Sequence, residues 1–413
     1  MENSIPSKWD TRYEVRAVAL LSLGFGLVGL DRFMIFPMFP TIMKALHLSY
    51  SNLGEISGIL SLTWGISAVF LGRISDIIGR RKVVIGSILV FSLLVGISGL
   101  ATGLFTLLLV RALMGFADGA YTPPSIIATL EASKPSRHGL NVGIQQMMLP
   151  LFGLALAPLV VTHLMQAVSW RWIFVMVTPF GLLVTLAAYF IIRPPAKLAY
   201  VEHSAVKDEL NHKWRDLFRY KNVIHNMIGM LCWLMCLTVT TAFLPNYLID
   251  YLHLSLISMG FVLSAIGFGA TIGALVMPAI SDRLGRKPVM IISTIGAFIS
   301  LFLFMRSGAQ PDKLFTFLLL TNFFNFALIT LTVGPVSAES VPAKLMAAAS
   351  GLVVCVGEWF GGGVAPVITG FVAQNYGIQH ILYLALGGLV IGFVNCCLLR
   401  ETAPVKLRGK LLA

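Results

Sequence analysis

The sequence predicts an all-α membrane protein in which twelve transmembrane helices form two similar six-helix halves. Of its 413 residues, 57% are hydrophobic and only 12% are charged, whereas soluble domains are about 25% charged. Apolar runs of about 20 residues, the length that crosses a bilayer, follow one another along the chain. A charged hairpin between two such runs, 72–82, recurs about half a chain length later at 278–287. Such an internal repeat is typical of carriers built from two related halves.

The apolar runs are continuous and too long to be the alternating strands of a membrane barrel, so each run predicts one helix. The mean hydropathy of +0.85 is too high for a surface that faces water. In chain order, the predicted helices cover residues 17–37, 53–72, 83–101, 103–125, 140–162, 171–192, 223–245, 256–279, 288–305, 314–336, 347–373 and 380–399.

These helices divide the chain into an N-terminal half, 1–192, and a C-terminal half, 223–413. Between them, 193–222 is the only long polar segment. It mixes charged residues with Trp214 and Phe218, which fits a surface helix that joins the halves. A solvated linker is the alternative interpretation.

The basic residues determine the predicted orientation. Twelve helices place both termini on one side, and 24 of the 30 Lys and Arg residues lie on that side. Four lie on the opposite side, and the remaining two, Arg32 and Arg111, fall within predicted helices. Because cytoplasmic loops are enriched in Lys and Arg, we expect both termini in the cytoplasm. Short loops favour the bacterial inner membrane, and the polar N-terminus lacks the apolar region of a signal peptide.

Several other functions are disfavoured by the sequence. The net charge of +12 is spread over separate loops and forms no continuous patch for nucleic acid. The five cysteines lie inside apolar runs, where packing is the expected role rather than metal binding or disulfides. Neither a phosphate-binding glycine motif nor a nucleophile triad is present. We therefore expect no enzyme activity, no cofactor, no metal and a monomeric carrier whose partners are its substrate, protons and the lipid bilayer.

The repeated hairpins resemble the signature of the major facilitator superfamily, which implies that family's fold and alternating-access transport. In that family the hairpin forms a cytoplasmic latch between helices of one half. Glycine permits the tight turn, and the acid can cap a helix or pair with an arginine when the gate closes. The resemblance implies gating roles for Asp76, Gly79, Arg80, Asp282, Gly285 and Arg286.

The predicted helix 103–125 carries a second family signature. Its Arg111, Gly115 and Gly119 match Arg-x-x-x-Gly-x-x-x-Gly, in which the glycines allow a neighbouring helix to approach closely. Asp118 lies seven residues after Arg111, so both side chains share one helix face roughly 10 Å apart. Charged side chains within a membrane are costly and usually face a cavity. A fixed structural charge pair is the alternative.

The predicted helix 17–37 carries the adjacent pair Asp31 and Arg32. Together with Arg111 and Asp118, this pair resembles the anion:cation symporter branch of the superfamily, which includes carriers of sugar acids. The resemblance implies proton-coupling roles for Asp31 and Asp118 and substrate-anion contacts for Arg32 and Arg111. A charge pair at a helix end is the alternative for Asp31 and Arg32.

Other candidate site residues are aromatic or carry amides. The predicted helix 53–72 lacks the Tyr and Gln that sugar-acid carriers often present there, and Trp64 and Tyr121 offer flatter, more apolar surface. A less hydroxylated carboxylate, such as an aromatic acid, is consistent with this difference. The aromatic-acid symporter family is a close alternative resemblance. Gln145, Asn322 and Asn325 are candidate substrate contacts, although a buried amide more often ties helices together. Glu358 precedes three glycines and Pro366, an interruption typical of transporter sites, and is either a further proton site or a polar contact.

The function expected from this resemblance is proton-coupled symport of a small organic anion, either a sugar acid or an aromatic or other monocarboxylate. Proton-coupled efflux of drugs or metabolites is the alternative, in which Asp31 or Asp118 alternates between a proton and a cationic substrate. A transporter-like receptor is the third class, which short loops disfavour.

Overall fold

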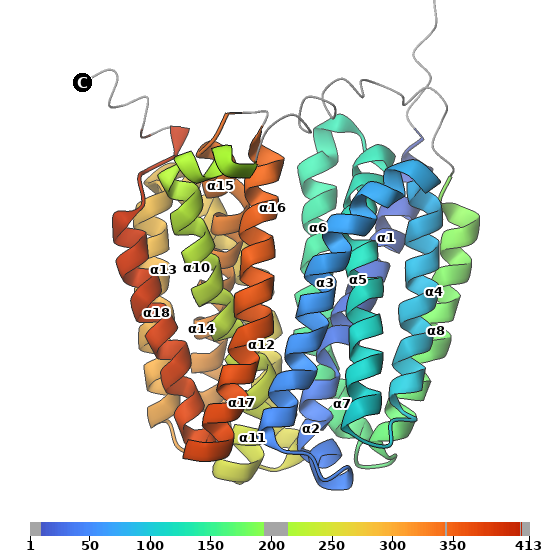
Figure 1. Cartoon of the computed structure of the whole chain (residues 1–413), viewed down its shortest axis with the longest axis vertical. Coiled ribbons are helices and arrows are strands. Elements are labelled where there is room, and N and C mark those ends of the chain that lie inside the picture. Colours follow the sequence, from blue (N-terminus) through green and yellow to red (C-terminus); the bar gives the residue numbers. More distant parts are fainter. Residues whose placement is uncertain (1–9, 194–213, 343–344, 405, 407–413) are drawn as a thin grey trace, which may run out of the picture.

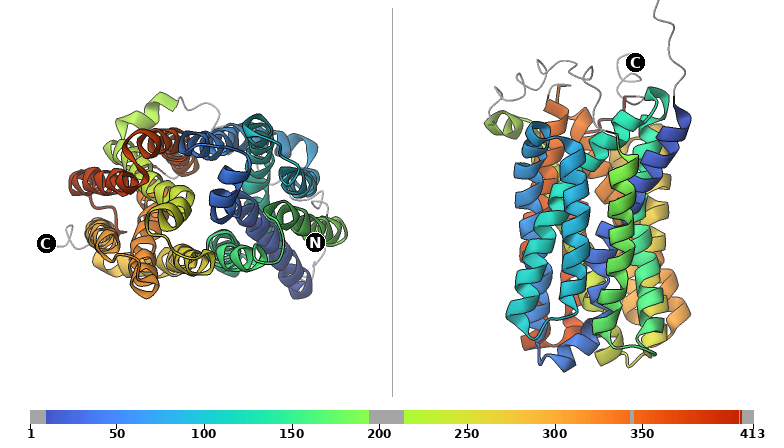
Figure 2. Two further views of the ribbon diagram at one scale, coloured as in Figure 1. Left: turned by 90° about the horizontal axis from the view of Figure 1, so that it is seen from below. Right: turned by 90° about the vertical axis from the view of Figure 1, so that its right-hand side faces the viewer.

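The computed structural model describes residues 10–193, 214–342, 345–404 and 406. Within these residues the chain forms helices and turns and no strand. Figure 1 shows two groups of long helices that stand side by side, one built by α1–α8 and the other by α10–α18, and Figure 2 shows the same two clusters along the helix axes. The predicted fold class is therefore confirmed.

The N-terminal half consists of six membrane-length helical segments, some of them divided into consecutive pieces. In chain order they are α1 with α2 (Thr11–Phe33, Ile35–Ala45), α3 (Tyr50–Ile78), α4 (Arg80–Ser98), α5 (Leu104–Ala132), α6 with η2 and α7 (His138–Pro150, Leu151–Leu156, Ala157–Leu164), and α8 (Trp170–Ile191). A short turn of 3-10 helix, η1 (Pro135–Arg137), precedes α6.

The C-terminal half repeats this plan. Its segments are α10 with η4, α11 and η5 (Lys221–Thr238, Val239–Phe243, Leu244–Asn246, Tyr247–Tyr251), α12 (Leu256–Leu284), α13 (Arg286–Arg306), α14 with η6 and α15 (Pro311–Leu331, Thr332–Val336, Ser337–Glu339), α16 with η8 and α17 (Met346–Val356, Gly357–Val364, Ala365–Tyr376), and η9 with α18 (Ile378–His380, Ile381–Leu398).

Among the described residues, eleven of these segments are long and apolar enough to cross a membrane. The remaining long helix is α3, with 29 residues, several of whose side chains lie outside the described part. The predicted linker 193–222 also falls largely outside the described residues. Of its remainder, Trp214–Arg219 forms a short 3-10 helix, η3.

Several helices extend beyond the predicted apolar runs, and the first one begins at a polar cap. The first segment was predicted over 17–37 and is observed over Thr11–Ala45. The Asp10 carboxylate caps α1 by accepting a hydrogen bond from the Tyr13 amide at 3.0 Å, and it pairs with Arg193 at 2.8 Å. These two contacts lower the pKa of Asp10 and connect the start of α1 to the end of α8.

Proline residues accompany the local π-helical segments that interrupt several helices. Pro150 directly precedes η2, Pro245 lies between η4 and η5, and Pro335 lies inside η6. Proline lacks an amide hydrogen and its ring clashes with the carbonyl four residues earlier, so one hydrogen bond of the regular ladder is lost at each of these positions. π-Helical turns are frequent at functional sites, and η2 lies against α12 of the other half.

We call the end of the bundle at which α1 begins and α18 ends the N-terminal face, and the opposite end the distal face (Figure 1, top and bottom). The outer surface between the two faces is apolar, as lipid contact requires, with Phe105 77% and Phe190 75% exposed. The halves pack along their distal portions, where α3 lies against η8 and α17, and where η2 and α7 lie against α12. At Gly58 the backbones approach so closely that a Cβ would lie 2.5 Å from the carbonyl oxygen of Gly363.

Candidate functional site

A cavity of about 570 Å³ lies between the two halves. This is a typical volume for a small-molecule site. Its walls come from α1, α2, α3, α5 and α6 on one side and from α10, η4, α12, α14, η6 and η8 on the other. The lining is mainly apolar, and the charged side chains in it are Arg32, Arg111 and Glu358. It extends to Gly139, in the first turn of α6 on the N-terminal face.

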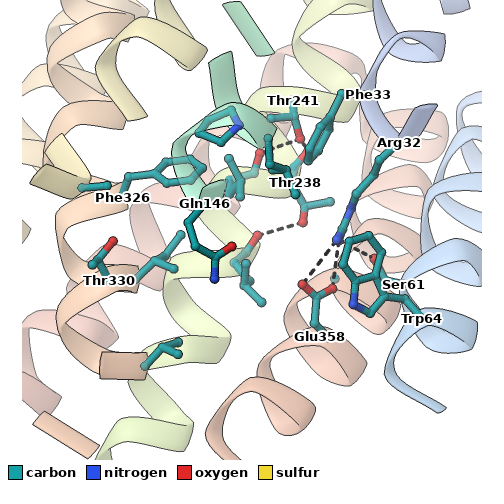
Figure 3. A pocket seen from close by; sticks show the side chains of 18 of the residues that line it. Arg32, Phe33, Ser61, Trp64, Gln146, Thr238, Thr241, Phe326, Thr330 and Glu358 are labelled. Carbon is teal, nitrogen blue, oxygen red and sulfur yellow. Dashed lines mark hydrogen bonds and ion pairs between the residues drawn. The ribbon is translucent and has the colours of Figure 1, made fainter. Parts of the chain in front are cut away.

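Arg32 and Glu358 form an ion pair across this cavity, from α1 of one half to η8 of the other (Figure 3). The Nη2 atom of Arg32 lies 2.8 Å from Oε2 of Glu358, and Nη1 lies 3.5 Å from Oε1. Nη2 also donates to the Ser61 hydroxyl at 3.0 Å. The side chains of the pair are only 14% and 12% exposed. The cavity therefore places a guanidinium and a carboxylate in mutual contact at the junction of the halves.

Aromatic rings cover the Arg32 guanidinium. Its Cζ atom lies 4.6 Å from the centroid of the Trp64 ring and 5.4 Å from that of Phe33. Ring faces attract cations, and Arg stacks on them while its N–H groups stay free for in-plane hydrogen bonds. Trp64 thus lines the cavity and contacts Arg32 there, while its contact with a substrate stays a prediction.

Behind this pair, Arg111 and two aspartates form a buried charged cluster. The Nη1 atom of Arg111 donates to the main-chain oxygen of Asp31 at 2.9 Å, which connects α5 to α1. Asp31, Arg111 and Asp118 are each 1% exposed or less. Among the described residues, neither aspartate side chain has a hydrogen-bond partner. Carboxylates in such surroundings require a cation or a proton to compensate their charge.

The other predicted substrate contacts lie outside the cavity wall. The Tyr121 hydroxyl donates to the Leu21 carbonyl at 2.8 Å, within the N-terminal half. Gln145 donates to Ser125 at 3.0 Å. In α14, Asn322 donates to the Leu318 carbonyl at 3.0 Å and Asn325 to that of Trp233 at 3.1 Å. In this conformation all four side chains make hydrogen bonds within their own half of the molecule. Their contacts with a substrate stay a prediction.

The cavity also contains polar residues that the sequence did not single out. They are Ser57, Ser61, Gln146, Thr238, Thr241 and Thr330. Gln146 follows the predicted Gln145, and successive helical residues point about 100° apart. The sequence showed both amides but not which of them faces the cavity, because that depends on the rotation of α6.

The hairpins at the N-terminal face contain the predicted gating residues. Gly79 and Gly285 have φ values of +98° and +104°, which side chains rarely adopt, so glycine is required at these turns. Arg80 pairs with Glu131 at the end of α5. The side chain of Asp76 lies outside the described part of the structure.

The second hairpin has a fuller set of contacts. Arg286 lies 2.6 Å from Asp282 and 2.8 Å from Glu339 at the end of α15. The carboxylate of Glu401 accepts the amide hydrogens of Arg286 and Lys287 at 2.8 and 3.2 Å. Glu131 and Glu339 occupy corresponding places in the two halves, because each pairs with the arginine of the hairpin in its own half. A comparison of the two repeats in the sequence could have identified them.

At the distal face a polar contact joins the halves. The Tyr50 hydroxyl of α3 donates to Asp250 of η5 at 2.8 Å, and Asn246 donates to the same carboxylate oxygen at 3.0 Å. The main-chain amide of Tyr50 donates to Gln374 of α17 at 3.1 Å. We call Tyr50, Asn246, Asp250 and Gln374 the distal latch. It closes the end of the bundle opposite to the one toward which the cavity extends.

Known proteins resemble this chain over nearly its whole length. The family model described as Major Facilitator Superfamily matches residues 21–364 and, in a second match, 252–411. The sialic acid transporter NanX of Escherichia coli is 24% identical, with 90% of this chain and 92% of NanX covered. The hexuronate transporter of Bacillus subtilis is also 24% identical, with 91% and 92% covered.

A solved structure supports the same fold. A bacterial homologue of the human lysosomal transporter Spinster, in an inward-facing and occupied conformation, superposes with a TM-score of 0.77 at 15% identity, with 94% of this chain and 96% of the homologue covered. With two charged hairpins in corresponding places and a cavity between two helical halves, the chain is a multi-pass membrane transporter rather than an enzyme, and it belongs to the major facilitator superfamily.

Proposed function

We propose that the chain imports a small organic anion together with protons by alternating access. The observation that carries this proposal is the Arg32 guanidinium, which lines a mainly apolar cavity between the halves with aromatic rings at 4.6 and 5.4 Å. A guanidinium fork matches a carboxylate in geometry and charge. The carboxylate of Glu358 already occupies this fork at 2.8 Å. An external carboxylate is thus the ligand whose chemistry fits best.

The proton-coupling part of the proposal rests on the buried cluster behind the cavity. Asp31 shares α1 with Arg32, and Arg111 both lines the cavity and contacts the main chain of Asp31. Binding of an anion at Arg32 changes the electrostatic potential at Asp31 and Asp118, which favours proton uptake by either acid. Release of the anion reverses the effect. Transport of anion and proton in the same direction follows from this linkage.

The direction of transport rests on the orientation of the bundle. The basic loops favour a cytoplasmic N-terminal face in a bacterial inner membrane. The cavity reaches that face at Gly139, while the distal latch joins Tyr50 and Asp250 at the other. In this orientation the structure would correspond to the state that releases substrate into the cytoplasm. Opening of the latch and closure around the hairpins would then give the uptake state.

Efflux of a lipophilic cation is the second candidate, and one observation favours it. Glu358 is an acid in a mainly apolar cavity, which is chemistry that suits a cationic drug. In that mechanism Glu358 would alternate between a proton and the drug, and Arg32 would be its counter-ion when both are absent.

The test is transport by purified protein in proteoliposomes with an inside-alkaline pH gradient. We would follow accumulation of sugar acids, aromatic acids and short monocarboxylates, with Asp118→Asn and Arg32→Ala beside the wild type. We expect gradient-driven accumulation of at least one acid, with loss of accumulation in both variants. If no acid accumulates while cationic dyes exchange against protons, the anion proposal is wrong and efflux replaces it.

A further inference from the structure

We propose that Glu358 is an internal substitute for the substrate carboxylate. It occupies the anion subsite of Arg32 in the empty carrier, and a substrate carboxylate enters that subsite only as Glu358 takes up a proton and withdraws. This inference rests on the proposed function, because it assumes that the substrate is an organic anion. Beyond the proposed function, the inference identifies Glu358 as the residue that competes with the substrate for Arg32. It also identifies Glu358 as the acid that takes up one of the protons in the transport cycle.

The contacts of Arg32 indicate that Glu358 and a substrate carboxylate need the same hydrogen-bond donors. Its guanidinium has donors directed at Glu358 and Ser61, and rings of Phe33 and Trp64 lie on it. The anion that fits best in the plane of this fork is the Glu358 carboxylate, which meets Nη2 at 2.8 Å and Nη1 at 3.5 Å. A substrate carboxylate that makes a bidentate contact needs the same donors. The two carboxylates therefore compete for one place.

The charges around the cavity indicate that Glu358 takes up a proton when a substrate anion displaces it. Arg32, Arg111 and Glu358 are the charged groups that line the cavity, with Asp31 and Asp118 buried behind them. Of the segments packed against η8, α3 presents Ser61 and α10 presents Thr238, which donates to the Gly361 carbonyl at 3.1 Å. Neither brings a cation to Glu358. If an anion displaced ionised Glu358, the substrate, Glu358, Asp31 and Asp118 would present four carboxylates to Arg32 and Arg111 in and behind an apolar site, which is costly. A proton from the medium that binds the Glu358 carboxylate removes one of these negative charges.

Glu358 must also be able to move away from Arg32, and the local backbone leaves space for this movement. It lies in the π-helical segment η8, one turn before Gly361, Gly362 and Gly363. A Cβ on Gly362 would lie 2.8 Å from Oε2 of Glu358, so the glycine leaves room for the carboxylate beside the main chain. The adjoining cavity of about 570 Å³ gives both the protonated side chain and the substrate space. The substrate body would then lie against apolar walls that include Phe326 and Leu275.

The experiment is isothermal titration of the full chain in nanodiscs with hydrocinnamate as the probe, and galacturonate as a sugar acid. Titration in buffers of different ionisation enthalpy gives the number of protons taken up per anion bound. Glu358→Gln is the test variant, since glutamine imitates the protonated acid. Glu55→Gln is the matched control, because Glu55 lies on α3 outside the cavity lining and is exposed. Glu358→Asp retains the acid and checks that effects come from the proton rather than from altered packing.

In the wild type and in Glu55→Gln we expect tighter binding as the pH falls, by roughly tenfold per pH unit for each proton taken up. In Glu358→Gln we expect proton uptake per anion to fall by one and affinity at alkaline pH to rise at least tenfold, while Glu358→Asp keeps the proton uptake. An acid that binds Glu358→Gln with undiminished proton uptake overturns this inference and leaves the proposed anion transport intact.

Two further outcomes distinguish the alternatives. If none of the four proteins binds either acid at any pH, the proposed function fails and the inference fails with it. Phenylalanine differs from hydrocinnamate by one ammonium group and serves as a zwitterionic probe. If phenylalanine binds the wild type more tightly than hydrocinnamate does and without proton uptake, Glu358 is a binding site for the substrate's ammonium group, and the inference is overturned.

Discussion

At the residue scale, the function of this carrier depends on which partner compensates each buried charge. Arg32 is compensated by Glu358 at 2.8 Å, from the other half of the molecule. Arg111 contacts the Asp31 main chain at 2.9 Å, while the Asp31 and Asp118 side chains are without hydrogen-bond partners among the described residues. The charges behind the cavity are therefore compensated collectively, so their removal should affect stability and transport in separable ways.

Replacing Arg111 separates these two effects. Arg111→Met removes the cation that faces two buried acids, and loss of one partner of a buried charge pair costs about 3–5 kcal/mol. We expect a lower thermal unfolding temperature in detergent and no transport. Arg111→Met combined with Asp31→Asn should recover most of the stability but none of the transport. An unfolding temperature of Arg111→Met equal to that of the wild type would show that Arg111 compensates no ionised carboxylate.

At the scale of elements, close helix packing within each half forms the rigid bodies between which the cavity lies. In the C-terminal half, α12 lies against α14 so closely that a Cβ on Gly273 would lie 1.9 Å from the Phe323 carbonyl oxygen. Small residues at such crossings let the backbones meet in van der Waals contact, the main source of helix association in lipid. Both helices also line the cavity, through Leu275 and Phe326.

Substitution of Gly273 tests this packing. Gly273→Ala forces α12 away from main-chain atoms that have little freedom to shift, so we expect destabilisation by about 1–3 kcal/mol. Gly387→Ala in α18 is the matched control, because nothing lies within 4 Å of the position its Cβ would take. The control should be neutral or slightly stabilising, since alanine favours helices. Thermal unfolding in one detergent compares both variants, and equal unfolding temperatures would contradict the packing argument.

At the scale of the whole molecule, polar contacts join the two halves at the distal face and within the cavity, and we expect them to select which face of the cavity is open. The distal latch joins Tyr50 to Asp250 and to Gln374, and the Arg32–Glu358 pair joins the halves within the cavity. In the proposed alternating access the latch would open in one state and close in the other. Its strength would then set the populations of the two states.

Weakening the latch should shift these populations. Tyr50→Phe removes one hydrogen bond to Asp250, worth about 1 kcal/mol, which corresponds to a roughly fivefold shift toward the state open at the distal face. The measurement is labelling of Ser57→Cys, in the cavity, by impermeant maleimide in a background without the five native cysteines. Distal labelling should become faster. Tyr376→Phe, exposed near the same face, is the control and should leave the rate unchanged.

Glu358 should also separate net transport from exchange. The empty carrier must change state with Arg32 compensated, and in Glu358→Gln no carboxylate remains on that guanidinium when the substrate is absent. An unpaired buried charge opposes the return step. We expect Glu358→Gln proteoliposomes to exchange internal for external labelled acid while net accumulation is lost. Parallel loss of both, in protein that still binds the acid, would contradict this role.

The sequence by itself determined the number of helices, their division into two halves and the places of the buried charges. Composition and run length control these features, since each apolar run must cross the bilayer and each charged residue inside one must find a partner. Arg32, Arg111, Asp31, Asp118 and Glu358 were identified in this way. The sequence also located the hairpin glycines, because positive φ values favour glycine.

Only the tertiary structure decided which of these residues meet. Arg32 and Glu358 are far apart in the chain and face each other at 2.8 Å because α1 and η8 pack around one cavity. The rotation of α6 placed Gln146 rather than Gln145 in the wall, and hydrophobic patterning reveals neither this rotation nor the π-helical segment that follows at Leu151–Leu156. Pairing across the halves depends on the relative placement of two packed bodies, and local sequence does not encode that placement residue by residue.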